Sequence, residues 1–336
     1  MGRDKLDVRG NFRRVVFERD GCRCIAPGCG VRGEDLLDAH HILSRKIMPD
    51  GGYVLENGVS LCKEKHHLEA ENGKIDVPTI RRLIGQLKDD YRHSFRKFPK
   101  VQKHPDFPTL EQDEEDAEPY SNTIDWKFMD THFHNSMWLV QEKVDGSNLG
   151  IGFNGDGSPY LQTRGQVADP HTMNIYSTSQ ERNVKYAIQW AWEHLEQIQK
   201  LPPTWMVYGE WMRYRHTVPY YELPDWFIAF AVHDGEKFLL PQDTLVFLRG
   251  LGFRVPPNID LNSLRTEEIE RATRKGLWTS GAAEGVVIKS MTDGTCVKWV
   301  RREFRDQMEK HGHWRRKQLE ENALASQPWA KPKETT

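Results

Sequence analysis

The chain has 336 residues, a net charge of −2 and 29% charged residues. This length is enough for two domains, and the near-neutral charge excludes an overall basic field that would attract nucleic acid to the whole surface. Basic residues gather instead in segments 9–14, 92–103 and 301–317. Because no secretory signal and no apolar run long enough to cross a bilayer is seen, we expect a cytoplasmic protein that does not contact membranes.

Four of the five cysteines lie in the first hundred residues. In a chain without a secretory signal, such clustering favours metal binding over disulfides. Cys24, Cys29, Cys62 and His66 would complete a tetrahedral site for Zn²⁺. Cys22 is an alternative to His66 as the fourth ligand.

A second set of possible metal ligands lies in the same segment as these cysteines. His67 and Glu71 are four positions apart and would share one face of a helix, with His40 as a third ligand from a preceding strand. His41 would point to the opposite side of that strand, where a neutral imidazole can activate water. Asn57 is placed to orient His41 through its side-chain amide.

Together these motifs, over residues 12–75, resemble the HNH nuclease family. The resemblance implies a zinc-containing ββα-metal fold that cuts phosphodiester bonds with one divalent cation, Mg²⁺ or Mn²⁺. Glu71 departs from the family pattern, because many members have histidine there. The alternative is a zinc-stabilised module that binds nucleic acid without cutting it. A segment this small buries too little apolar surface to be stable without a metal in either case.

The next segment predicts the end of this domain. Residues 78–96 have the apolar spacing of a helix that closes an N-terminal domain over residues 1–98. Three prolines and the acidic run 111–118 then disfavour regular structure, so we expect a linker over residues 99–122. The acidic run would serve either as a solvated tether or as an occupant of a basic groove when substrate is absent.

The second half of the chain opens with a distinctive turn. An apolar run that ends at Val140 has strand character, and Lys143, Asp145, Gly146 and Asn148 follow it. Further motifs then occur in a fixed order: Thr163-Arg164-Gly165, Val207-Tyr208-Gly209-Glu210, Glu284-Gly285-Val286-Val287-Ile288-Lys289 and Val297-Lys298-Trp299. This series resembles the covalent nucleotidyltransferase superfamily of RNA ligases, DNA ligases and mRNA capping enzymes.

A lysine that takes up AMP needs surroundings that favour loss of its proton and that place positive charge around the α-phosphate. A free lysine amine is protonated at neutral pH, and burial of Lys143 beside a divalent cation would favour the neutral nucleophile. Cations must also surround the α-phosphate, and the candidates besides Mg²⁺ are Lys289, Lys298 and Arg164. Glu284 is the candidate to help hold the metal, and Glu210 would accept hydrogen bonds from a ribose hydroxyl.

The purine site is expected on the aromatic-rich strand at residues 226–230. Phe230 is the candidate stacking ring, and Phe227 is its rival. The family often has an acidic residue after this phenylalanine, whereas Ala231 follows here, so either the register differs or a metal contact is absent. The Glu142-Lys143 pair favours ATP as the donor, with GTP as the alternative.

The remaining elements predict the architecture. Residues 181–200 read as an amphipathic helix with Val184, Ile188, Trp192 and Leu195 on its buried stripe, among several short strands. We therefore expect an α+β chain of two domains. The second, at residues 123–300, would be a nucleotidyltransferase domain of antiparallel sheets with helices, an ATP-grasp-like adenylation fold. A basic helix, read through residue 325, and a tail would fill residues 301–336.

The short C-terminal part bears on the class of ligase. It cannot hold the OB-fold that DNA ligases and capping enzymes carry after the last motif, and RNA ligases lack that OB-fold, so RNA ligases are favoured. The resemblance is to the RNA ligase 2 type, but that type has a longer helical C-terminal domain than this chain can supply. The resemblance implies an ATP-dependent RNA ligase that joins 5′-phosphate and 3′-hydroxyl ends of nicked or broken RNA or DNA, coupled to an HNH endonuclease. A DNA ligase without an OB-fold is the alternative, and the sequence identifies no protein partner.

Overall fold

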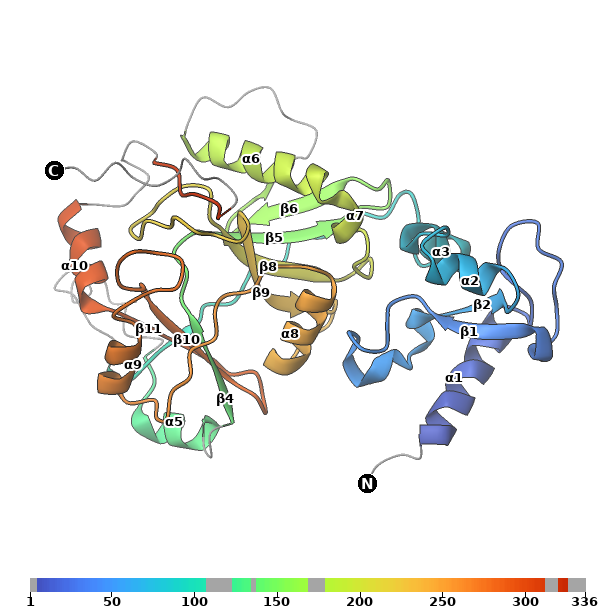
Figure 1. Ribbon diagram of the computed structural model, residues 1–336, viewed down its shortest axis with the longest axis horizontal. Helices are drawn as coiled ribbons and strands as arrows, with labels where there is room; N and C mark the ends of the chain where they lie inside the picture. The colour runs from blue at the N-terminus through green and yellow to red at the C-terminus, as the bar shows by residue number, and fades with distance from the viewer. Residues whose placement is uncertain (1–4, 107–122, 134–136, 169–178, 312–319, 326–336) are drawn as a thin grey trace.

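The computed structural model describes residues 5–106, 123–133, 137–168, 179–311 and 320–325. Figure 1 shows a small N-terminal unit beside a larger body built from two sheets and several helices. No helix in these ranges is both long and apolar enough to cross a membrane.

The N-terminal unit contains the expected succession of two strands and a helix. Strands β1 (Leu37–His41) and β2 (Gly58–Cys62) pair antiparallel, with helices α1 (Lys5–Arg19), α2 (His66–Glu71) and α3 (Val77–Leu83) around them. Short 3-10 turns precede the two strands: η1 (Glu34–Leu36), η2 (Pro49–Gly52) and η3 (Leu55–Asn57). A compact apolar core joins α1 to both strands through Phe12, Val16, Leu37, Val59 and Leu61.

The helix expected over residues 78–96 is much shorter. α3 begins after Asp76, whose side chain accepts a hydrogen bond from the Thr79 N–H at 2.7 Å. It ends at Leu83, because Gly85 adopts a positive φ of 72°, a conformation that stops helices and suits glycine. Residues 84–101 then contain no helix or strand.

The expected linker is part of the large body where it can be described. Strand β3 (Gln102–Lys103) pairs in parallel with β11 (Cys296–Val300), so residues up to 106 lie along the large body instead of forming a free tether. The acidic run 111–118 lies outside the described residues.

The large body has two sheets, and the expected mixed α+β fold with antiparallel sheets is confirmed. One sheet has the order β3-β11-β10-β4, with β10 (Gly285–Ser290) antiparallel to β4 (Trp138–Glu142) and to β11. The other has the order β7-β6-β5-β8-β9, with strands Val167–Ala168, Pro159–Thr163, Ser147–Phe153, Met206–Trp211 and Phe227–His233. Helices α5 (Trp126–His132), α6 (Ser179–Glu193), α7 (Leu195–Ile198), α8 (Pro241–Gly250) and α9 (Thr266–Ala272) lie around these sheets (Figure 1).

The expected amphipathic helix is present as α6 and α7, and Val184 and Ile188 pack against the core as predicted, but the prediction was wrong at Trp192. Trp192 is 37% exposed, whereas Trp190 is 4% exposed and packs in the core with Ile188. The Trp190 indole N–H donates to Asp225 at 2.8 Å, so this ring is held by a polar contact as well as by packing.

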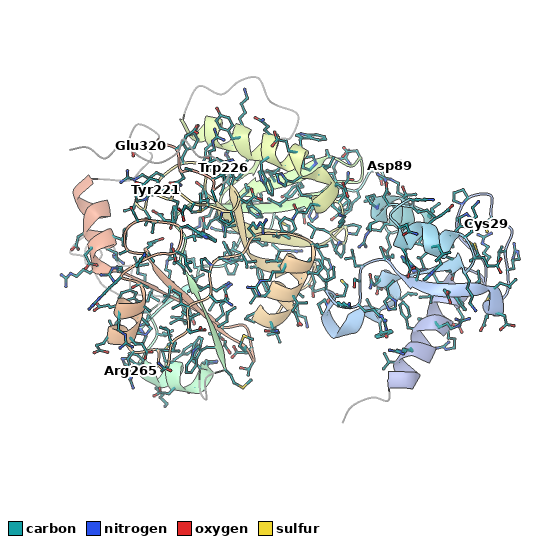
Figure 2. All side chains as sticks on the ribbon, in the orientation of Figure 1. Cys29, Asp89, Tyr221, Trp226, Arg265 and Glu320 are labelled. Carbon is teal, nitrogen blue, oxygen red and sulfur yellow. The ribbon has the colours of Figure 1, made fainter. Side chains whose placement is uncertain are left out.

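The C-terminal segment also differs from the helix expected through residue 325. α10 spans Arg302–His311, but residues 320–325 run extended along residues 213–224, at the edge where Figure 2 marks Tyr221, Trp226 and Glu320. Buried Asn322 accepts a hydrogen bond from the Tyr220 N–H and donates to the Met212 carbonyl. This segment therefore covers the large body rather than extending the helix.

Candidate functional site

A cavity of about 1040 Å³ lies between the two sheets. Side chains of both sheets line it, including Lys143, Asn148, Glu210, Phe230 and Lys298. The motifs that the sequence separates by up to about 150 residues therefore meet around one space.

Lys143 follows β4 and projects into this cavity. Its backbone N–H donates to the Gly285 carbonyl at 2.9 Å, and its side-chain Nζ donates to Glu284 Oε2 at 2.7 Å. Val144 also borders the cavity and is part of the core, where it is 4% exposed. The turn requires glycine at Gly146, because a Cβ there would lie 2.7 Å from the Trp211 carbonyl oxygen.

The charges around Lys143 oppose its activation in the absence of a cation. Burial alone would lower the pKa of Lys143, but Glu284, Asp145 and Glu210 together raise it above its ordinary value. Burial also raises the pKa of Glu284 to about 7 and that of Glu210 to about 8. Without a cation, burial is outweighed by the three carboxyl groups that surround the ammonium, so the expected neutral lysine depends on the divalent cation.

These carboxyl groups fit a divalent cation. Glu210 Oε2 is buried without a hydrogen-bond partner among the described residues, and Glu210 pairs in register with Asn148 on the neighbouring strand. Buried carboxylate oxygens are the ligands that Mg²⁺ and Mn²⁺ prefer, so Glu210 and Glu284 could hold such an ion. The free oxygen of Glu210 is equally able to accept a ribose hydroxyl, the role expected from the sequence.

The three cations expected around the phosphates differ in their surroundings. Burial, with a contribution from Lys143, lowers the pKa of Lys298 to about 8, and Lys298 lines the cavity. Arg164 lies on the exposed turn after β6 and also lines the cavity. Lys289 donates at 2.8 Å both to Gln141 Oε1 and to the Phe230 carbonyl, so in this structure its ammonium supports the strand that carries the aromatic ring.

A β-bulge determines which phenylalanine faces the cavity. Tyr208 pairs with Ala231 and Gly209 with Ala229, so Phe230 is the extra residue of β9. Phe230 lines the cavity, whereas Phe227 is fully buried in the core on the other side. Phe230 rather than Phe227 therefore faces the cavity, where it is placed to stack on a purine.

Glu142 is held by the loop before β10. It is 2% exposed, and its Oε2 accepts a hydrogen bond from the Leu277 N–H at 3.0 Å. Burial raises the pKa of this carboxyl group. Its other oxygen is buried without a partner among the described residues.

Sequence reasoning missed the residues that hold Asp145. Asp145 Oδ2 accepts from the N–H groups of Thr217 and Val218 at 2.7 and 3.1 Å, and His216 Nδ1 lies 3.7 Å from Oδ1. His216 Nε2 is 3.3 Å from Ser147 Oγ. Burial alone would raise the pKa of Asp145, but these contacts lower it, so the carboxylate stays ionised. Nothing in the spacing of a histidine some 70 residues away marks this contact.

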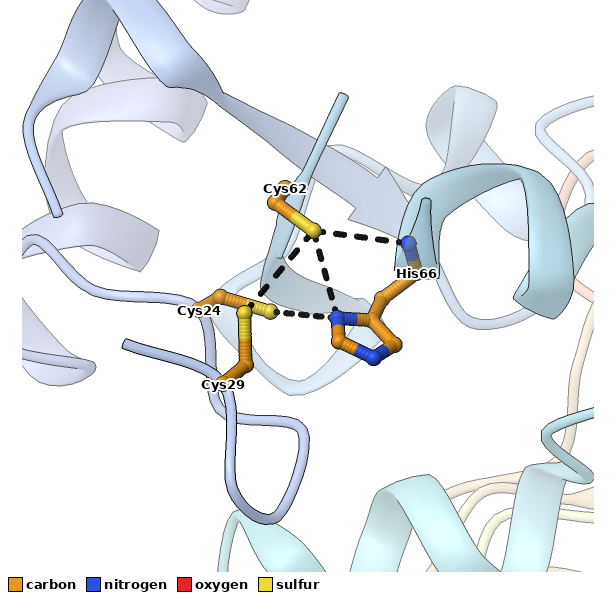
Figure 3. A group of neighbouring side chains, drawn as sticks. All are labelled: Cys24, Cys29, Cys62 and His66. Atoms are coloured by element: carbon orange, nitrogen blue, oxygen red, sulfur yellow. Dashed lines mark hydrogen bonds between the residues drawn. The ribbon is translucent and has the colours of Figure 1, made fainter. Parts of the chain in front are cut away.

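The predicted zinc ligands come together in the N-terminal unit. The ligand atoms of Cys24, Cys29, Cys62 and His66 all lie within 4.8 Å of one another, as Figure 3 shows. His66 Nδ1 is 3.2 Å from the Cys62 sulfur and 3.4 Å from that of Cys24. Three thiols and one imidazole are a usual donor set for structural Zn²⁺, and Cys22 is not part of the group.

The second predicted ligand set is assembled only in part. The rings of His40 and His67 are 5.0 Å apart, and His67 Nε2 is 3.9 Å from Glu71 Oε1. Over the ranges that the structure describes, these three residues do not form a group as compact as the cysteine cluster. His41 is stacked on Phe12 at 4.4 Å, and its buried Nε2 has no partner there.

Asn57 does not orient His41 through its amide as expected. Its Oδ1 accepts from the Leu43 N–H at 2.8 Å, and its Nδ2 donates to the carbonyls of Leu43 and Gly52 at 3.1 Å. All three of these hydrogen bonds are to backbone groups. Asn57 fixes the loop that follows His41 and acts on the histidine only through the backbone.

The comparisons with known proteins concern the large body. Residues 136–300, slightly less than half of the chain, match the model of the RNA ligase family. A solved Naegleria gruberi RNA ligase with PPi is 16% identical with a TM-score of 0.41, and the match covers 76% of this chain and 72% of that one. An archaeal ATP-dependent RNA ligase is 19% identical with a TM-score of 0.39, over 63% of this chain and 50% of that one.

These structural likenesses are too distant to transfer side-chain roles. The chain spans only half the length of the archaeal ligase. No curated protein matches the chain.

Proposed function

We propose that this protein is an ATP-dependent RNA ligase that forms a lysyl-AMP at Lys143. The observation that carries the proposal is the position of Lys143, 2.7 Å from Glu284 in a cavity that also holds Glu210, Lys298 and Phe230. This cavity is built largely from the segment that matches the RNA ligase family.

The reaction would use one site three times. Lys143 Nζ loses its proton to solvent and forms a P–N bond to the α-phosphorus of ATP, while the bond to pyrophosphate breaks. The AMP then passes to a 5′-phosphate end, and a 3′-hydroxyl displaces it as the ends join. Lys298 and Arg164 would stabilise the charge that develops on the phosphates, and Phe230 would stack on the adenine.

A divalent cation would complete the site. Held by Glu210 and Glu284, Mg²⁺ or Mn²⁺ would neutralise the carboxylates that raise the pKa of Lys143, so that burial lowers it. The buried, unpartnered oxygen of Glu210 supports this placement.

Sealing of nicked duplexes tests the ligase proposal. Wild-type protein with ATP and Mg²⁺ is expected to seal a nick with RNA on the 3′-hydroxyl side faster than an all-DNA nick, because a 2′-hydroxyl distinguishes RNA from DNA. Lys143→Arg should seal neither, since its guanidinium stays protonated. Equal or faster sealing of the DNA nick would favour a DNA ligase without an OB-fold.

We also propose a metal-dependent endonuclease site in the N-terminal unit. Two observations support it: the strand–strand–helix arrangement with His40 and His67 rings 5.0 Å apart, and the unpartnered Nε2 of His41. His40, His67 and Glu71 would hold Mg²⁺ or Mn²⁺, His41 would activate water, and Zn²⁺ on the cysteine cluster would stabilise the unit.

Nicking assays on DNA and RNA test this second proposal. Wild type and Lys143→Ala should both cut in the presence of Mg²⁺ or Mn²⁺, and His41→Ala should not. If wild type never cuts but still retards nucleic acid in a gel, the unit is a zinc-stabilised binding module. If it does cut, the nuclease would either trim ends before sealing or cleave a foreign nucleic acid.

A further inference from the structure

The segment between the two parts of the chain forms a wall of the nucleotide cavity. We call residues 96–103 the connector. Its members Phe98, Pro99, Lys100, Val101, Gln102 and Lys103 all line the cavity. The connector lies outside the region that matches the RNA ligase family, which begins at residue 136. The motifs of the large body therefore do not enclose the site by themselves.

Both ends of the connector are anchored. At its start, the Arg96 carbonyl accepts hydrogen bonds from Tyr208 Oη at 2.7 Å and from Gln162 Nε2 at 2.6 Å, and the Arg96 guanidinium donates to the Gly235 carbonyl at 2.9 Å. At its end, β3 pairs with β11, and the His104 N–H donates to the Lys298 carbonyl at 3.0 Å. The connector therefore has a defined position against both sheets.

Phe98 reaches the ring that is placed to stack on adenine. Its centroid lies 5.3 Å from that of Phe230 with an edge-to-face angle of 76°, and 5.1 and 5.4 Å from those of Tyr208 and Phe238. Edge-to-face contacts of this kind are favourable and restrict the orientation of both rings. Phe98 is thus a positioning residue for Phe230.

Lys103 lies next to a cation of the proposed site. Lys103 and Lys298 are partners in the parallel register of β3 and β11, and both line the cavity. Burial is the main cause of the lowered pKa of Lys298, and the neighbouring charge of Lys103 acts in the same direction. Two neighbouring lysines at a cavity are stabilised when an anion lies between or beside them, and a polyphosphate is such an anion.

We propose that the connector is part of the ATP site, with Lys103 contacting the phosphates of ATP beside Lys298 and Phe98 holding Phe230 in its stacking orientation. This inference rests on the proposed nucleotidyl transfer to Lys143. It implies that the connection to the N-terminal unit is also a component of the ligase active site.

The test measures lysyl-AMP formation against ATP concentration in full-length protein. Lys103→Ala should raise the KM for ATP by about tenfold, because a charge-assisted hydrogen bond of about 1.4 kcal/mol is lost. Lys103→Arg should recover most of this loss. Phe98→Ala should raise KM by about threefold through the ring contact. Lys97→Ala is the matched control, because Lys97 is an exposed lysine of the same connector that does not line the cavity.

A second measurement separates binding from chemistry. Calorimetric titration of ATP into Lys143→Ala protein, with and without Lys103→Ala, should show the same tenfold weakening in Kd. If Lys103→Ala binds ATP and forms lysyl-AMP as Lys97→Ala does, the inference is overturned while the ligase proposal stands. If the wild type forms no lysyl-AMP at all, the proposed function itself fails, and the wild-type experiment alone shows this.

Discussion

The orientation of Phe230 at the bulge of β9 predicts how much the KM for ATP should rise when its aromatic ring is removed. Phe230→Leu keeps an apolar side chain in the cavity but removes the aromatic face. Stacking of two aromatic systems is worth about 0.5–1.5 kcal/mol beyond the buried area, so the KM for ATP should rise about 2-fold to 12-fold. The rate at saturating ATP should change little, because stacking on adenine stabilises the bound substrate and the transition state alike.

Phe227→Leu is the matched control for this experiment. Phe227 is fully buried and lies 5.3 Å from the Trp190 ring, on the core side of β9. Its shortening should cost roughly 1–2 kcal/mol of stability and lower Tm by several degrees, with no change in the KM for ATP. The assay is the initial rate of AMP labelling of the protein at varied ATP, beside thermal unfolding followed by circular dichroism. A raised KM in Phe227→Leu together with an unchanged KM in Phe230→Leu would refute the assignment of the two faces.

Three further predictions concern metal, packing and pH. Cys29→Ser should lose stoichiometric bound zinc, and its N-terminal unit should unfold at a lower temperature. Removing zinc from the wild type with a chelator should have the same effect on unfolding. Equal zinc content in the variant and the wild type would contradict a zinc site at the cysteine cluster. Asn57→Ala should lower the free energy of unfolding by about 1–3 kcal/mol, because buried backbone groups lose their partners. The matched change at an exposed site, Asn72→Ala, should alter it by less than about 0.5 kcal/mol. Equal free energies of unfolding for the two variants in denaturant titrations would contradict this. The folded pKa of Glu210, about 8, lies above its unfolded value, so its contribution to stability is complete below the unfolded pKa and is lost as pH rises through about 8. In the absence of divalent cations, Tm should therefore fall as pH rises from about 4.5 to about 8, by less in Glu210→Gln, and an equal fall in both would argue against a buried protonated Glu210.

The features that the sequence predicts well are those whose chemistry requires a fixed local spacing. Cys24 and Cys29, and likewise Cys62 and His66, are close in the chain because both pairs must reach one ion, and the structure brings the pairs together. The turn at Lys143 is similarly local, since the backbone three residues after the lysine leaves no room for a side chain at Gly146. These contacts could be inferred before any tertiary structure was known.

Contacts that depend on the packing of distant segments were not predictable. The strand Gln102–Lys103 has only two residues, and no local pattern marks which sheet edge it joins. His216 reaches Asp145 from a loop with no motif of its own. On α6, the buried Trp190 packs against distant segments and donates to Asp225 outside the helix, whereas Trp192 is exposed. Periodicity alone allowed either ring to face the core.

Protonation at Lys143 shows why a motif does not determine a reactive state. Burial and neighbouring charge act on the pKa of Lys143 in opposite directions, and the three carboxyl groups outweigh burial. Their distances to the lysine follow from the pairing of β4, β5, β8 and β10, which spacing in the chain does not provide. The structure therefore adds the carboxyl groups that oppose loss of the proton, whereas the divalent cation beside Lys143 was already expected from the sequence.

Covalent labelling at Lys143 tests the ligase account most directly. Purified protein, first treated with pyrophosphate to remove bound AMP, is incubated with α-³²P-labelled ATP and Mg²⁺, and the adduct is located by intact-mass and peptide-mass analysis beside Lys143→Ala. The account predicts an AMP adduct on the peptide that contains Lys143 in the wild type and none in the variant. An adduct at another residue, or no adduct with either ATP or GTP in folded wild-type protein, would contradict it.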